Sequence, residues 1–178
     1  MDRLRSDLLE LIDRLKGLEI HSPFVDAYLQ DTAFTRKEIY RREVLTPIKL
    51  LEVILNSKVE KRHPLGKVAI VVPKNALGIP MAKAVAASHL MGNETILRLP
   101  RQLSRAEPIY RNLLGESLKG IEFAPPTQSA KDFLIQCLKA PDIQAIVVYG
   151  DEVWIDEYYP LAQQTQTKFI LKDRATIR

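Results

Sequence analysis

The residues best suited to chemistry are few and widely spaced in this chain. There is one cysteine, Cys137, and there are three histidines, His21, His63 and His89. Cys137 falls within an apolar helical pattern that has no histidine near it in sequence, so we interpret it as a small core residue and not as a nucleophile. The histidines lack the spacing of zinc ligands, and no metal site is predicted.

Four loops could carry a binding site, because each follows an apolar stretch with the character of a strand. They are residues 73–78 (PKNALG), 98–102 (RLPRQ), 124–128 (APPTQ) and 149–152 (YGDE). In an open parallel sheet such loops meet beyond the carboxyl ends of the strands, where ligands bind. None of the four contains the GxGxxG motif of common dinucleotide-binding domains. The loops alone therefore do not indicate a nicotinamide cofactor.

The strands that must position these loops alternate with helical patterns. Residues 68–72 (VAIVV) form a short, continuous apolar and β-branched run that is typical of a strand buried on both faces. Further strands are predicted at 95–99, 121–124, 145–149 and 168–171. Between them, capping-box signals at Ser104 with Glu107 and at Ser129 with Asp132 predict helix starts. The alternation predicts an α/β fold with a doubly wound, mostly parallel five-stranded sheet of Rossmann-like type.

Helices are also predicted ahead of the first strand. Leucines and isoleucines recur there at helical spacing, so residues 1–62 are interpreted as a helical segment packed on a cofactor-binding-type domain of residues 63–178. Thr35 with Glu38 forms a capping box at the start of one of these helices. Pro47 predicts a break or kink in the helix that follows.

The composition is that of an ordinary globular protein. Hydrophobic residues make up 46% of the chain and charged residues 27%, which excludes a disordered chain. The net charge is +4, but basic residues are interleaved with acidic ones, so nucleic-acid binding is not predicted. No apolar run is long enough for a membrane span. The single cysteine favours a cytoplasmic protein without disulfides.

Residues 64–100, PLGKVAIVVPKNALGIPMAKAVAASHLMGNETILRLP, resemble the cofactor-binding half of the aldehyde dehydrogenase superfamily. The shared features are a Pro-Leu-Gly lead-in, a Pro-x-Asn turn at 73–75, an alanine-rich helix, a Gly-Asn pair and a strand that ends in the basic residue Arg98. Residues 141–152, PDIQAIVVYGDE, are similar to the strand and glycine turn of the second cofactor contact. Within the superfamily the chain is most similar to fatty acyl-CoA reductases of the bioluminescence type and to gamma-glutamyl phosphate reductase. The resemblance covers about residues 60–178.

This resemblance implies an NAD(P) site at Pro73, Lys74, Asn75, Arg98 and Gly150. Asn75 corresponds to the oxyanion position, where an amide N–H stabilises the oxygen that becomes negative when a thiolate attacks a carbonyl. An asparagine that only caps the turn is the alternative. Arg98 corresponds to a residue on the adenosine ribose, and a guanidinium there could pair with a 2′-phosphate, which slightly favours NADP; its alternative is a solvated arginine. Gly150 would let the backbone approach the pyrophosphate.

Three functions remain open from the sequence. The first is a truncated or split aldehyde dehydrogenase-like or acyl-CoA reductase-like cofactor domain, inactive alone because the half with the catalytic cysteine is missing. The second is a non-catalytic interaction or assembly module, a pseudoenzyme, which the acidic Asp151 and Glu152 after the glycine favour. The third is an unrelated nucleotide- or phosphate-binding domain. A protein partner would supply the missing half or dock on a C-terminal helix with Trp154, Tyr158 and Tyr159.

Overall fold

A parallel five-stranded sheet forms the centre of the computed structural model, which describes residues 2–57, 63–73, 75–150 and 156–172. The strand order is β3-β2-β1-β4-β5, and every neighbouring pair is parallel. The strands are β1 Lys67–Val71, β2 Glu94–Arg98, β3 Ile121–Phe123, β4 Ile143–Tyr149 and β5 Lys168–Lys172. This confirms the predicted Rossmann-like sheet and places its first strand in the middle.

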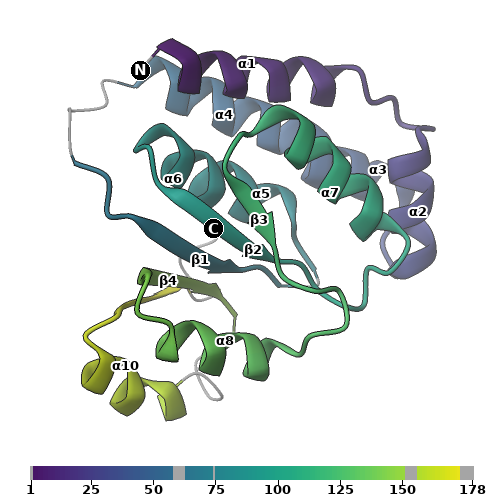
Figure 1. The fold of residues 1–178 in the computed structure, drawn as a ribbon. Helices are drawn as coiled ribbons and strands as arrows, with labels where there is room; N and C mark the ends of the chain where they lie inside the picture. The colour runs from purple at the N-terminus through teal and green to yellow at the C-terminus, as the bar shows by residue number, and fades with distance from the viewer. Residues whose placement is uncertain (1, 58–62, 74, 151–155, 173–178) are drawn as a thin grey trace.

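The central strands β1 and β4 are mostly apolar because both of their faces are covered. Alternate side chains of β1 enter different clusters: Val68 and Ile70 pack in one hydrophobic core, and Ala69 and Val71 pack in the other. Helices that join the strands cover both faces of the sheet (Figure 1) and contribute to both cores. On the first face lie α5 Gly78–Pro80, η2 Met81–Val85, α6 Ala86–Leu90 and α7 Ala106–Ser117, and on the second lie α8 Ala130–Lys139, η3 Asp156–Tyr158 and α10 Tyr159–Thr165.

The N-terminal helices form a further layer outside the first face. They are α1 Asp2–Lys16, α2 Pro23–Asp31, α3 Arg36–Ile39, η1 Tyr40–Leu45 and α4 Thr46–Asn56. Figure 1 shows α1 and α4 lying beyond α6 and α7, away from the sheet. The leucine stripe of α1 joins the same hydrophobic core as α7, so these helices pack on the sheet domain through its own helices.

The break predicted at Pro47 is a widened helical turn. The chain stays helical from Arg36 to Asn56, but η1 is a π-helix in which Thr46 N–H bonds the carbonyl of Arg41, five residues earlier. Because Pro47 has no N–H to donate, it cannot bond the carbonyl four residues before it, and a π turn absorbs the mismatch. The helix therefore bulges directly beside Glu43 without ending.

The predicted caps have mixed outcomes. The box of Thr35 with Glu38 is present, and Ser129 accepts the N–H of Asp132. The prediction for Ser104 is wrong, because α7 begins at Ala106 and no side chain of its own segment caps it. Asp31 of α2 accepts the N–H groups of Arg105 and Ala106 at 2.8 and 3.0 Å, so the cap comes from another helix.

Candidate functional site

Three of the predicted site segments leave the sheet at one edge. In the parallel register, Val71 of β1 pairs with Arg98 of β2 and with Val148 of β4. The turn that carries Asn75 follows β1, and Gly150 follows β4. The structure therefore brings the turn, Arg98 and Gly150 to the carboxyl ends of three adjacent strands, which is where open α/β sheets bind ligands.

Asn75 lies in the turn between β1 and α5 and is exposed. Its carbonyl oxygen accepts a hydrogen bond from Nη2 of Arg42 at 2.6 Å. Pro73 is half-buried at the start of the turn, and Lys74 lies outside the described residues. Among the described residues no hydrogen bond engages the side-chain amide of Asn75, so the backbone of this turn is held while the amide stays open to solvent.

Arg98 is buried, with 7% of its surface exposed. Its Nη2 donates to the carbonyl oxygen of Gln128 at 3.4 Å, and its Nε has no hydrogen-bond partner. No carboxylate in the described part of the chain forms an ion pair with it. Burial lowers the pKa of the guanidinium, and the nearby charge of Arg101 lowers it further. The alternative of a solvated strand-end arginine is thereby excluded.

Gly150 is half-buried and directly follows Tyr149, whose pKa burial raises to about 12. Asp151 and Glu152, the two carboxylates that weigh against a pyrophosphate in the sequence, lie outside the described residues. The glycine itself is thus at the expected edge of the sheet, next to a buried phenol.

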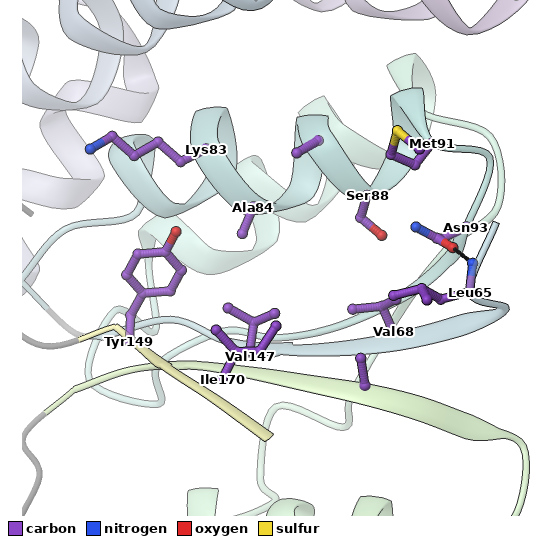
Figure 2. A pocket seen from close by; sticks show the side chains of 12 residues that line it. Leu65, Val68, Lys83, Ala84, Ser88, Met91, Asn93, Val147, Tyr149 and Ile170 are labelled. Atoms are coloured by element: carbon purple, nitrogen blue, oxygen red, sulfur yellow. Dashed lines mark hydrogen bonds between the residues drawn. The ribbon is translucent and has the colours of Figure 1, made fainter. Parts of the chain in front are cut away.

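A cavity of about 450 Å³ runs along one face of the sheet, between the helix of η2 and α6 and the strands β1, β4 and β5, and only its Tyr149 end reaches the carboxyl edge (Figure 2). Lys83 and Tyr149 lie at one end of it, and Met91 and Leu65 lie at the other. The rest of its lining is mostly small or apolar and includes Val68, Val147, Ile170, Ala84 and Ala87. A cavity of this size and character is typical of a ligand or docking site.

Glu43 is a candidate functional residue that the sequence analysis did not identify. It is 1% exposed, and its Oε2 accepts the N–H groups of Leu77 and Gly78 at 3.0 and 2.7 Å. Burial raises its pKa to about 7. A signal was present, because Glu43 lies four residues after Ile39 and four before Pro47, on the stripe that faces the core.

Cys137 is confirmed as a core residue. It is 2% exposed and packs in the second hydrophobic core, and burial raises the pKa of its thiol to about 12. Because the thiolate is the reactive form, Cys137 has neither the access nor the ionisation of a nucleophile.

We expect iodoacetamide to leave Cys137 unmodified in the folded protein at pH 8 over hours, and to alkylate it fully within minutes in urea. Intact-protein mass spectrometry measures both. Rapid modification under native conditions would contradict the burial of this side chain.

The described residues contain no group of three or more His, Cys, Asp or Glu side chains that could hold a metal ion. In the same part of the chain, no helix has both the length and the apolar character needed to cross a membrane.

No protein-family model and no curated protein sequence matches the chain, whereas solved structures do. The substrate-bound AldH of Staphylococcus aureus superimposes with a TM-score of 0.75 at 17% identity, over 96% of this chain and 41% of that one. The NAD⁺ complex of an aldehyde dehydrogenase from Bacillus cereus gives 0.76 at 12% identity, over 96% and 38%. A mutant AldC of Pseudomonas syringae, in complex with NAD⁺ and octanal, gives 0.75 at 14% identity, over 96% and 37%.

The chain therefore has the fold of the aldehyde dehydrogenase superfamily, as the resemblance in the sequence implies. It spans only 37–41% of the length of the three matched structures. It superimposes on only a part of each of these structures.

Proposed function

We propose that this chain is the cofactor-binding part of an aldehyde dehydrogenase-type oxidoreductase and binds NAD(P), with NADP favoured. The reactive cysteine would come from polypeptide outside these 178 residues, because Cys137 is buried and protonated. The fold supports the class of protein in this proposal, and one buried side chain supports the nucleotide site. The state of Arg98 supports it specifically.

The observation that carries the proposal is a buried guanidinium without an anionic partner. Removing a cation from water is costly unless hydrogen bonds and an opposite charge compensate it. Arg98 has only the long bond to Gln128, and its Nε is unsatisfied. A ribose hydroxyl or a 2′-phosphate would supply the missing acceptors, and the fork of an arginine matches a phosphate in a bidentate manner.

The other edge residues fit the same ligand. The half-buried Gly150 leaves room for a backbone approach to the pyrophosphate, since it has no side chain. The exposed amide of Asn75 can donate to an oxygen that gains negative charge during acyl chemistry. When bound, NAD(P) supplies a nicotinamide ring that accepts or donates a hydride.

A titration of nicotinamide fluorescence with NADPH and NADH tests the proposal. We expect saturable binding of both, tighter for NADPH, and Arg98→Met should weaken NADPH about tenfold, as loss of a charge-assisted hydrogen bond does. Methionine keeps the apolar packing of the arginine stem and removes the unpaired charge, so the variant should remain folded by circular dichroism.

Lys119→Ala is the matched control, because Lys119 is exposed and lies in the turn before β3, at the opposite edge of the sheet. It should leave both affinities unchanged. Binding that Arg98→Met does not alter would refute the role of Arg98, and no binding of either nucleotide at millimolar concentration would refute the function.

A second candidate is a non-catalytic interaction module, with a protein partner that supplies the rest of the fold. The apolar cavity favours it, because Ala84, Ala87 and Met91 form an apolar stripe along it on a helix whose opposite side is already in the core. An exposed apolar stripe of this kind is typical of a surface that packs against another segment. Absence of nucleotide binding, together with a stable complex that Ala87→Arg abolishes, would favour this function over the first.

A further inference from the structure

Glu43 connects the N-terminal helices to the turn that carries Asn75. Its Oε2 accepts the N–H groups of both Leu77 and Gly78, which are the first free N–H groups at the start of the helix after that turn. The preceding residue, Arg42, donates to the carbonyl oxygen of Asn75. Two neighbouring residues of η1 therefore bind the turn at its middle and at its end.

The start of α5 packs closely against η1. A Cβ on Gly78 would lie 2.9 Å from the carbonyl oxygen of Arg42 and 3.1 Å from Cα of Glu43. The guanidinium of Arg42 also stacks over the ring of Phe34, with 4.4 Å to its centroid. The position of the turn thus depends on η1.

The groups that face Glu43 come from three elements besides its own. The phenol of Tyr28 from α2 lies near enough for the charge of Glu43 to contribute to raising its pKa. Tyr110 from α7 donates to the carbonyl oxygen of Leu77 at 3.3 Å, and the same charge acts on its phenol. The start of α5 contributes backbone N–H groups. Among the described residues, the cation that acts on Glu43 is Arg42 of η1 itself.

We infer that Glu43 is a positioning residue for the Asn75 turn, and that the protonation of its carboxyl changes how firmly the turn is fixed for the cofactor. The inference rests on the proposed function for its link to NAD(P). An ionised carboxylate makes the stronger, charge-assisted bonds to N–H groups at a helix start. The neutral acid makes weaker ones.

The burial of Glu43 sets the pH range in which the hold on the turn should change. Desolvation raises the pKa of Glu43 to about 7, against the opposing effect of the bonds from Gly78 and Leu77. The turn should therefore be held most firmly above pH 7 and less firmly below it. Glu43→Gln keeps an oxygen that can accept both bonds but never ionises, so it reproduces the neutral acid at every pH.

The experiment has two readouts on the whole chain. In ¹H–¹⁵N NMR spectra of the cofactor-free protein, the amide resonances of Leu77, Gly78 and Asn75 should titrate together near pH 7, and should not do so in Glu43→Gln. In a fluorescence titration, the affinity for NADH should fall about fivefold from pH 8 to pH 6, and Glu43→Gln should show the weaker value throughout. NADH is the probe because the 2′-phosphate of NADPH would itself titrate near pH 6.

Glu107→Gln is the matched control, since Glu107 is also buried but pairs with Arg111 within α7. Its spectra and its pH profile should follow the unchanged protein. Amides of Leu77 and Gly78 that do not titrate, or that titrate without Asn75, would overturn the inference. Titrating amides with no NADH binding at any pH would refute the proposed function and leave the positioning of the turn supported.

Discussion

Replacing Gly78 with alanine should lower the free energy of unfolding by about 3 kcal/mol, as overpacking a rigid site does. The added Cβ would lie 2.4 Å from Cγ of Pro47 and 2.9 Å from the carbonyl oxygen of Arg42. Neither contact can be relieved by a side-chain rotation, because one partner is a proline ring and the other is backbone. The α4 and η1 helices would have to move away from the start of α5. Urea unfolding followed by circular dichroism measures the loss.

The control for this prediction is Gly115→Ala. Gly115 is exposed inside α7, and a Cβ there would make only an ordinary contact of 3.7 Å with the ring of Phe123. Alanine favours a helix interior over glycine by about 0.5–1 kcal/mol, so this variant should be slightly more stable. Equal effects of the two substitutions would show that the contact of Gly78 with η1 is not tight.

The second large effect is a pH-dependent stability caused by Glu43. Because its pKa is raised to about 7 in the folded protein, from 4.5, the folded state binds the proton more tightly than the unfolded state does. The contribution of Glu43 to the stability of the whole fold is therefore complete below pH 4.5 and is lost as the pH rises to 7, a decrease of about 3 kcal/mol in the free energy of unfolding. This direction is opposite to that for the turn because global unfolding returns the carboxylate to water, whereas release of the turn alone removes only its bonds from Leu77 and Gly78, which favour the ionised form. Glu43→Gln should abolish this decrease.

The free energies of unfolding of Glu43→Gln and of the unchanged chain must be compared at each pH. The reason is that His89 changes the stability of both proteins in the opposite direction as the pH rises. Burial lowers the pKa of His89, which lies 3.1 Å from Asp7, so its contribution to stability is lost as the pH falls below about 6.5. The difference between Glu43→Gln and the unchanged chain isolates Glu43. A constant difference from pH 4.5 to pH 8, measured by urea unfolding, would contradict the raised pKa.

Much of the fold was predictable, because its signals are local. The central strand β1 is an almost unbroken apolar run, as a strand buried on both faces should be. All five strands lie within two residues of their predicted bounds. The caps at Thr35 and Ser129 depend on a residue only three positions away. Even the resemblance to aldehyde dehydrogenases rests on short motifs whose order along the chain matches the order of the sheet loops.

The contacts that define the candidate site could not be predicted from local sequence patterns. The sequence by itself determined that Asn75 and Gly150 follow strands and that Arg98 ends one, and hence that the three share an edge of the sheet. Tertiary structure decided that Arg98 is buried without an anionic partner, that Asp31 caps a helix 75 residues away, and that Glu43 binds N–H groups 34 and 35 residues away. Such contacts arise where separate segments pack together, and a polar side chain reveals its partner only when the burial around it is known.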